Sequence, residues 1–577
     1  MYRFVVPAVL ALAAALPAQT NFFLVKDVKP GMKGVGRTIF RGNQIEEFQV
    51  EILGVLDNTG PKQSLILARL SGGPLEHTGV LQGMSGSPVY IDGRLLGAVA
   101  MAFPWAKDPI AGIRPIEEMV KVGTDPPAPV ARAQIAIGDH DLTRVLAKAR
   151  PTVFGESRLI DIATPMAFGG FTHATLDAFS PQLRELGLEP LQAITSGSDI
   201  NGRMGNPADL KPGSMISVQL MSGDLSVGAD GTVTYLDGSR IYAFGHRFMA
   251  VGPTTLPFAR AEVLTLLPNV NTSFKLSTAK EWMGTINQDR DTAIAGELGR
   301  RPALVPVSVS VARAGRQVDS YHMQMINDPL LSPLLVQMAV FSTIDATERS
   351  VGASSIRVSG QIEFVNSPAP VKLNNIFSAD NGAAMQGSLS AAVPVAYVLQ
   401  SGFRALQLKN IVVQVEALDQ KKALSIDSVS TSRRRVRPGE KLQIHLTLNG
   451  ENRVEMDRTV EYQVPAGAPE GLLYFTASDA NVANINDFRQ LLTTSPHNET
   501  QLIGLVNGLH PNNKVYVRVW RTDPAYQLEG ADLPDPPASV SLILSNSQAN
   551  VAGITQVKNS KIDEIEIDAG DMVVSGN

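Results

Sequence analysis

A short turn rich in glycine and serine, residues 83–88 (GMSGSP), constrains the fold of this chain most strongly. It lies between two apolar runs, TGVLQ and VYIDGRLLGAV, and the second run contains an Asp-Gly pair that is typical of a tight hairpin. The sequence therefore predicts a glycine turn followed by a rigid hairpin. Glycines allow the backbone to bend so that the amides of Gly83 and Ser85 point to one spot. Such a pair of amides can hold a developing oxyanion.

An isolated Gly-x-Ser-Gly motif more often marks a plain hairpin turn than a nucleophile, so a longer pattern is needed. Residues 78–119 (TGVLQGMSGSPVYIDGRLLGAVAMAFPWAKDPIAGIRPIEEM) resemble the serine-bearing segment of the SpoIVB peptidase family. The turn also resembles Gly-Asp-Ser-Gly-Gly-Pro of trypsin-like serine peptidases. A second family landmark, a Gly-Thr strand leading to a Gly-His turn, is similar to GTVTY and AFGH at residues 231–246, which follow LKPG. The resemblance covers about residues 30–122 and 208–310.

The resemblance implies a serine peptidase with Ser85 as nucleophile and His246 as general base. A serine hydroxyl needs such a base because it is otherwise a poor nucleophile. The amides of Gly83 and Ser85 would form the oxyanion hole. The chain has eight histidines, and His77 is the rival base because it lies near Ser85 in sequence.

The acid that would orient the histidine is harder to identify. In the family an Asp precedes the serine segment, but the corresponding residues 69–78 (RLSGGPLEHT) contain none. Asp289 is the preferred candidate because trypsin-like peptidases place the acid some tens of residues after the histidine, within the same barrel, and a structural ion pair with Arg290 or another neighbour is the alternative. The other candidates are Asp291, Glu76 and Asp57. A Ser–His pair without a carboxylate is a further possibility, since triads retain residual activity when a member is lost.

The order of the two segments departs from the family, in which the histidine precedes the serine. Here Ser85 comes before His246. If each half closes into its own barrel and the site lies between them, chain order need not matter, because the same triad geometry occurs in unrelated orders. A scaffold that has lost its activity is the alternative interpretation.

Composition limits the remaining function classes. The chain has 577 residues, of which 18% are charged, with 49 glycines and 37 prolines, which indicates a mainly β protein of several domains. A net charge of −5 argues against nucleic acid as a partner. The chain has no cysteine, which excludes disulfides, thiolate metal sites and a cysteine nucleophile. We expect no cofactor and no metal.

The first 18 residues have the features of a secretory signal peptide. A short positive end precedes an apolar run at residues 4–16, and cleavage near Ala18 is expected. The run is too short to span a bilayer comfortably, which disfavours a membrane anchor. We therefore expect an exported protein, periplasmic or extracellular in a bacterium, with no membrane span after removal of the signal.

The pattern of strands and linkers predicts four further segments. A serine-bearing β-barrel half is expected at residues 21–125, a mixed α/β insertion at 126–208 and a histidine-bearing barrel half at 209–360. Residues 361–577 are expected to form a C-terminal immunoglobulin-like β-sandwich, because residues 436–448 alternate between polar and apolar. The fold class is thus mainly β, a trypsin-like double barrel in rearranged order with a sandwich.

These features predict an exported serine endopeptidase that acts on protein or peptide substrates. The alternative is a catalytically inactive exported scaffold that binds envelope proteins or peptides. A peptide-binding module within residues 130–220, like the PDZ domain of sporulation peptidases, has weaker support.

Overall fold

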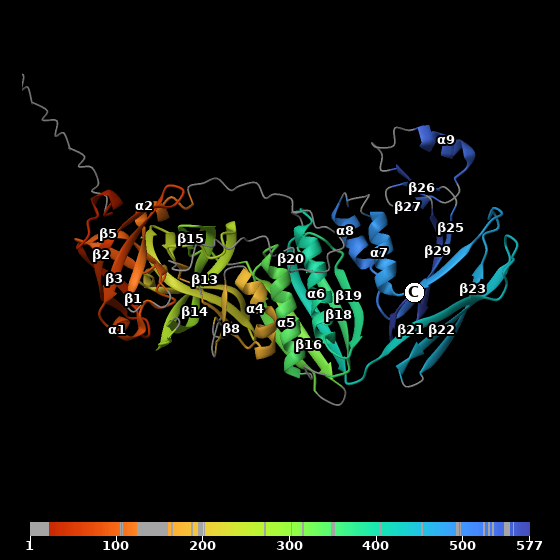
Figure 1. The fold of residues 1–577 in the computed structure, drawn as a ribbon, viewed down its shortest axis with the longest axis horizontal. Coiled ribbons are helices and arrows are strands. Elements are labelled where there is room, and N and C mark those ends of the chain that lie inside the picture. Colours follow the sequence, from red (N-terminus) through yellow and green to blue (C-terminus); the bar gives the residue numbers. More distant parts are fainter. Residues whose placement is uncertain are drawn as a thin grey trace, which may run out of the picture.

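A computed structural model of the chain describes residues 22–123 and 160–577, with short gaps. The gaps are at residues 104–105, 107, 163–164, 186–187, 194–199, 201, 271–272, 302, 314–316, 348–351, 404–405, 452–453, 492–495, 497, 523–524, 529–530, 534–535, 547–553 and 558. The signal peptide expected at residues 1–18 lies outside the described residues. So does the part of the expected insertion that precedes residue 160, residues 126–159. The described residues are mainly in β-strands. Their N-terminal, middle and C-terminal regions follow one another in chain order along the long axis of the molecule (Figure 1).

The N-terminal part is a closed barrel of six antiparallel strands. Its strands pair in the order β4-β1-β2-β3-β6-β5, and pairing of β4 with β5 closes the ring. Four of them have the Greek-key order 4-1-2-3. The barrel strands and the added strand β7 are β1 (Lys33–Ile39), β2 (Ile45–Gly60), β3 (Gln63–Ser71), β4 (Pro88–Ile91), β5 (Arg94–Ala102), β6 (Ile110–Pro115) and β7 (Ile160–Asp161). The short helices are η1 (Val25–Asp27), α1 (Leu75–Thr78) and α2 (Ile116–Met119).

Local sequence accounts for the hairpin that supports the serine turn. Asp92 and Gly93 connect β4 to β5 with φ values of +50° and +74°. Positive φ at both central residues is the geometry of a two-residue type I′ turn, for which Asp-Gly is a preferred pair. The hairpin predicted after residue 88 is thus present, and the apolar side chains of both strands enter the barrel core around Val89, Leu96 and Val99.

The middle of the molecule is a sheet of thirteen strands. Its strands are β8 (Pro165–Gly169), β9 (Glu189–Ala193), β10 (Met215–Gly223), β11 (Ser226–Asp237), β12 (Arg240–Ala243), β13 (Gly252–Leu267), β14 (Phe274–Arg290), β15 (Ala293–Leu298), β16 (Val305–Arg313), β17 (Asp319–Met325), β18 (Ser354–Phe364), β19 (Val371–Ala379) and β20 (Leu408–Leu418). Its helices are α4 (His173–Glu185), η2 (Pro207–Asp209), α5 (Leu331–Thr347) and α6 (Ala383–Gln400).

Six strands of this sheet also pair in a closed ring. Their order is β10-β11-β12-β15-β14-β13, all antiparallel, and β10 pairs with β13 to complete the ring. Counted along the chain from its own first strand, each ring has the order 1-2-3-6-5-4. The two rings therefore share one strand order.

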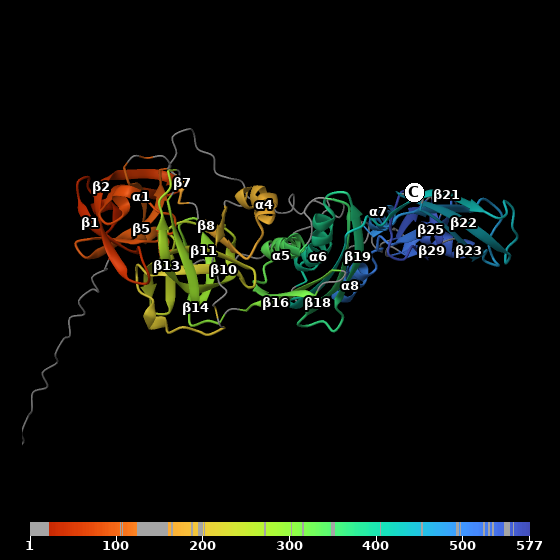
Figure 2. The ribbon, with the colours of Figure 1, turned by 90° about the horizontal axis from the view of Figure 1, so that it is seen from below.

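Two long helices cover the other end of the large sheet. Helix α5 packs on α6 and on β16, and α6 packs on β18 and β19 (Figures 1 and 2). Both are largely buried, and Pro394 lies inside α6. The strands that these helices cover extend the large sheet as far as residue 418, so the boundary expected between residues 360 and 361 falls inside β18.

The C-terminal part contains two sheets that share a core. One has the order β23-β22-β21-β30 and the other β24-β25-β29, and apolar residues from both form a single cluster. The elements of this part are β21 (Ala423–Thr431), β22 (Lys441–Gly450), β23 (Glu455–Gln463), β24 (Tyr474–Ser478), α7 (Ala480–Leu491), α8 (Glu499–Asn507), β25 (Lys514–Arg521), β26 (Ala525–Leu528), β27 (Ala531–Leu533), α9 (Ala538–Asn546), β28 (Ile554–Val557), β29 (Ser560–Asp568) and β30 (Val573–Ser575). The immunoglobulin-like topology stays a prediction. Across the residues described, none of the helices is both long and apolar enough to cross a membrane.

Candidate active site

Ser85 lies in a turn fixed by glycines and by the hairpin behind it. Gly83 and Gly86 have φ values of +89° and +92°, a region that favours glycine. The Gly86 amide donates a hydrogen bond of 2.7 Å to the carbonyl of Val99 on β5, which ties the turn to the barrel wall. Ser85 is fully buried, and its Oγ has no hydrogen-bond partner among the described residues.

The backbone amides of Gly83 and of Ser85 itself are available to a hydrogen-bond acceptor such as a substrate carbonyl oxygen. Among the described residues, neither the Gly83 amide nor the Ser85 amide donates a hydrogen bond to the protein, whereas Met84 and Ser87 donate within the turn. Amides that flank a nucleophile and remain unused are what an oxyanion hole requires.

His246 lies in the turn that follows β12. Phe244 and Gly245 before it have φ values of +71° and +73°. A positive φ at a bulky residue such as phenylalanine is rare and costly, and such conformations cluster at functional sites. His246 is 1% exposed, and its Nδ1 lies 2.6 Å from the carbonyl oxygen of Arg247.

This contact fixes the tautomer of the neutral imidazole. A carbonyl oxygen only accepts hydrogen bonds, so Nδ1 of His246 carries the proton and donates to Arg247. The other ring nitrogen, Nε2, is then the one that can accept a proton. Nε2 is fully buried.

The serine and histidine turns lie against one another at the junction of the two rings. The Thr232 amide donates to the Ser85 carbonyl (2.8 Å), and Thr234 Oγ1 donates to the Gly86 carbonyl (2.7 Å). A Cβ on Gly86 would overlap the Thr232 carbonyl and lie 2.6 Å from the Phe244 nitrogen. The structure therefore brings together two turns that are far apart in the sequence.

The first barrel also holds the histidine turn directly. A Cβ on Gly245 would lie 3.1 Å from the Cβ atoms of Ala98 and Ala100 on β5. Buried Arg114 on β6 donates from Nε to the Gly245 carbonyl (3.4 Å) and pairs with Glu118 (3.4 Å). Because Gly245 precedes the histidine, these contacts help to position it.

Asp289, near the end of β14, holds the loop after His246. Its buried carboxylate accepts hydrogen bonds from the amides of Phe248 (2.8 Å), Met249 (2.7 Å) and Val251 (3.3 Å). Burial raises the pKa of Asp289, whereas these amides and the charge of His246 lower it. The expected alternative partner, Arg290, instead donates to Gln288 (3.2 Å).

The other sequence candidates lie at the surface. His77 and Glu76 are exposed on α1, and Asp57 is exposed on β2, where it accepts from Ser64. Asp291 is also exposed and lies 3.8 Å from Arg247. Of the five titratable candidates other than His246, Asp289 alone is buried beside the histidine turn.

Lys275, which no sequence motif singled out, is buried beside the serine turn. Its Nζ donates to Thr38 Oγ1 (2.7 Å), and burial lowers its pKa to about 7. Burial raises the pKa of Asp230, which accepts hydrogen bonds from Ser277 and Ser217 and attracts Lys275. In the sequence Lys275 alternates with the apolar residues on either side of it, a pattern that predicts an exposed lysine, so the sequence carried no signal for its burial.

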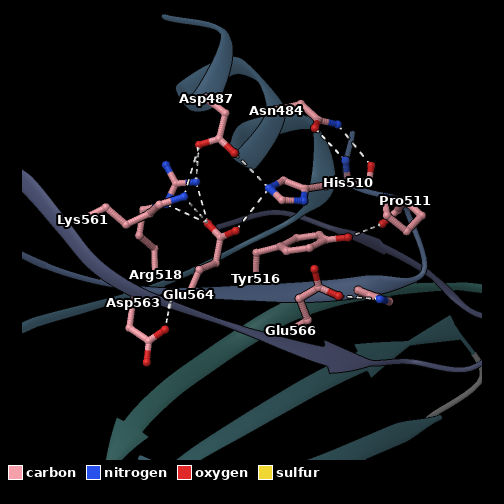
Figure 3. A network of polar contacts seen from close by, with 11 residues as sticks. Asn484, Asp487, His510, Pro511, Tyr516, Arg518, Lys561, Asp563, Glu564 and Glu566 are labelled. Atoms are coloured by element: carbon pink, nitrogen blue, oxygen red, sulfur yellow. Dashed lines mark hydrogen bonds and ion pairs between the residues drawn. The ribbon is translucent and has the colours of Figure 1, made fainter. Parts of the chain in front are cut away.

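A cluster in the C-terminal part has the composition of a metal site. Asp487, His510 and Glu564 place ligand atoms within 4.8 Å of one another (Figure 3). However, Arg518 Nη2 donates to both carboxylates, at 2.7 Å to Asp487 and 2.6 Å to Glu564, and Lys561 lies within 4.0 Å of both. These cations already neutralise the carboxylates, so the cluster is an ion network.

Comparison with known proteins assigns the first barrel. Residues 14–120 match the model of the SpoIVB peptidase S55 family. The match includes Ser85 and Gly83, whereas His246 and Asp289 lie beyond it. No curated protein and no solved structure matches the chain. The N-terminal part, with the serine turn at its centre, is therefore a SpoIVB peptidase S55 family domain.

Proposed function

We propose that this protein is an exported serine endopeptidase in which Ser85 attacks the substrate and His246 is the general base. One observation carries the proposal: the serine turn of an S55 peptidase domain packs against a buried histidine turn contributed by a separate ring of strands. Two unused amides beside the serine support it.

The orientation of the imidazole supports a defined proton path. With Nδ1–H directed to the Arg247 carbonyl, Nε2 accepts the proton from Ser85 Oγ as Oγ attacks the scissile carbonyl carbon. The oxyanion that forms receives hydrogen bonds from the Gly83 and Ser85 amides. His246 then returns the proton to the leaving amine, and water hydrolyses the acyl-enzyme by the reverse route.

We propose that Asp289 acts as the acid of this site through its charge, since the Nδ1 proton of His246 is donated to the Arg247 carbonyl and not to Asp289. Its charge and that of a protonated His246 attract each other, which is the electrostatic role of a triad carboxylate. Its three amide contacts also hold the loop whose carbonyl orients the imidazole. Asp289 therefore combines charge stabilisation with positioning.

The strand orders support a trypsin-like double barrel. The ring β10-β11-β12-β15-β14-β13 has the same order as the S55 barrel, and the candidate site lies where the two rings meet. In this arrangement the serine-bearing barrel precedes the histidine-bearing barrel in the chain, the reverse of the family order. The C-terminal sheets would serve binding or stability.

The N-terminal sequence supports a location for the protein, and that location limits its substrates. The apolar run at residues 4–16 supports export to the periplasm or to the exterior of a bacterium. The substrate is then a protein or peptide outside the cytoplasm. Because Ser85 Oγ is buried, residues that enclose the turn must move before a substrate binds.

An inactive scaffold is the second candidate, favoured by the burial of both Ser85 and His246. A proteolysis assay separates the two. The mature protein should cleave a denatured protein such as casein, and Ser85→Ala should reduce the rate by at least about 1000-fold because the nucleophile is lost. Equal cleavage by wild type and Ser85→Ala, or none by either across casein and a peptide library, would favour the scaffold.

A further inference from the structure

Lys275 extends from the second ring of strands into the wall of the first barrel. It lies at the start of β14 and is 3% exposed. Its Nζ donates to Oγ1 of Thr38 on β1 (2.7 Å), and Ser87 Oγ donates to the same oxygen (3.0 Å). Ser87 follows Ser85 by two residues, so a chain of three polar groups connects Lys275 to the serine turn.

Lys275 also contacts the residues that precede Ser85. Its amide donates to the Gln82 carbonyl (3.1 Å), and the Gln82 amide donates to Ser273 (2.8 Å). A Cβ on Gly83 would lie 3.3 Å from Cδ of Lys275. Lys275 thus holds the turn on both sides of the nucleophile, at residues 82–83 directly and at residue 87 through Thr38.

The burial of an amine at this position is costly. The charged groups that act on it are Asp230 on β11 and Glu46 on β2. Burial lowers the pKa of Lys275 to about 7 and raises that of Asp230, so the site disfavours both charges. An apolar side chain of similar length would avoid this cost. The amine adds the hydrogen bond to Thr38 and an attraction to Asp230 that offsets part of this cost.

We propose that Lys275 is a positioning residue for Ser85 and acts through the Thr38 hydroxyl. The inference rests on the proposed peptidase function and extends it. By its contacts with Gly83 and, through Thr38, with Ser87, Lys275 holds the Ser85 hydroxyl and the oxyanion amides in fixed relative positions. Residues that surround a preorganised site commonly have this supporting role.

Four single variants, and the double variant of Lys275→Met with Thr38→Val, test this role by the rate of labelling with a fluorophosphonate probe and by melting temperature. Lys275→Met keeps the apolar part of the side chain and removes the amine. Thr38→Val removes the hydroxyl at nearly constant shape, whereas Thr38→Ser retains the hydroxyl. Lys280→Met is the control on the same strand, since Lys280 is half-buried and lies 4.0 Å from Glu262.

We expect Lys275→Met and Thr38→Val each to slow labelling by about 10- to 100-fold with a melting temperature near that of wild type. The double variant should label no more slowly than either single variant, because both substitutions remove the same hydrogen bond between Lys275 and Thr38. Thr38→Ser and Lys280→Met should label at close to the wild-type rate.

Wild-type labelling by Lys275→Met, or losses that are additive in the double variant, would overturn the positioning role while leaving the peptidase proposal intact. A rate that falls only together with the melting temperature would also overturn it, because Lys275 would then be structural. Absence of labelling in wild type would overturn the peptidase proposal, and this inference with it.

Discussion

At the scale of single residues, Asp289 holds the loop after His246, and we propose that it is also the acid of the site. Its two carboxylate oxygens accept three hydrogen bonds from backbone amides of the loop after His246. An asparagine at this position offers one acceptor oxygen, and its amide group would face at least one of the donors. The loop that orients the imidazole would then lose a hydrogen bond in a buried setting.

Asp289→Asn should therefore lower the free energy of unfolding by about 1–3 kcal/mol. It should also slow probe labelling by orders of magnitude, because the charge that stabilises the imidazolium is lost. Calorimetry and the labelling rate of the same variant check the two parts. Reduced stability with an unchanged labelling rate would show that Asp289 holds the loop and is not the acid.

Single residues also show where sequence reasoning stops. The serine turn was recognisable because Gly83, Ser85 and Gly86 act within one short segment. Lys275 was not, because its importance depends on contacts with Thr38 and Gln82, which are more than 190 positions away in the chain. Only the contact between β14 and the serine-bearing segment places an amine beside the serine turn.

At the scale of elements, the junction between the two turns depends on a glycine that no other residue can replace. Gly86 faces the Thr232 carbonyl and the Phe244 nitrogen with no space for a Cβ. Gly93 also has a positive φ, but nothing lies within 4 Å of the position its Cβ would occupy. The two glycines therefore differ in packing and share their backbone conformation.

Gly86→Ala should destabilise the protein by about 3 kcal/mol or more and abolish labelling, since the turns must separate. Gly93→Ala should cost about 1–2 kcal/mol, from backbone strain alone, and leave labelling intact. Calorimetry and probe labelling of both variants provide the comparison. Similar effects of the two substitutions would contradict the close contact between the turns.

The ion network of β25 and β29 makes the C-terminal part sensitive to pH. Burial alone would lower the pKa of His510, but hydrogen bonds to Asp487 (3.0 Å) and Glu564 raise it to about 9 (Figure 3). The usual value is 6.5. The stabilisation is therefore complete below pH 6.5 and is lost as the pH rises through about 9, because folding must take up a proton between these values and the folded His510 is neutral above them.

Hydrogen exchange of the β25 and β29 amides in wild type and His510→Gln should show this window. The difference in protection should be largest near pH 6 and should shrink toward pH 10. His445→Gln, at an exposed position of the same part, is the control and should show no such trend. A difference between wild type and His510→Gln that is constant with pH would contradict a charged His510 in the network.

Elements also divide into those that the sequence predicts and those that it does not. The hairpin at Asp92-Gly93 is visible as a local pattern and is present. Helices α5 and α6 were not anticipated. Both are buried on most sides, so their apolar residues show no helical stripe, and α6 contains Pro394.

At the scale of the whole molecule, the candidate site is a property of the junction between two closed rings. Ser85 comes from the S55 domain, whereas His246, Asp289 and Lys275 come from the second ring. Family resemblance identified the first ring, and its match ends at residue 120. The second ring lies beyond that match and within the resemblance noted at residues 208–310, and strand pairing shows that it has the same strand order as the first ring.

The most direct measurement of the central claim is fluorophosphonate labelling of the mature protein, with the modified residue identified by peptide mass spectrometry. The account predicts labelling at Ser85, none in Ser85→Ala and a loss of at least about 1000-fold in His246→Ala. His77→Ala, at an exposed position, should retain most of the rate. Labelling elsewhere, no labelling of wild type, or equal losses from His77→Ala and His246→Ala would contradict it.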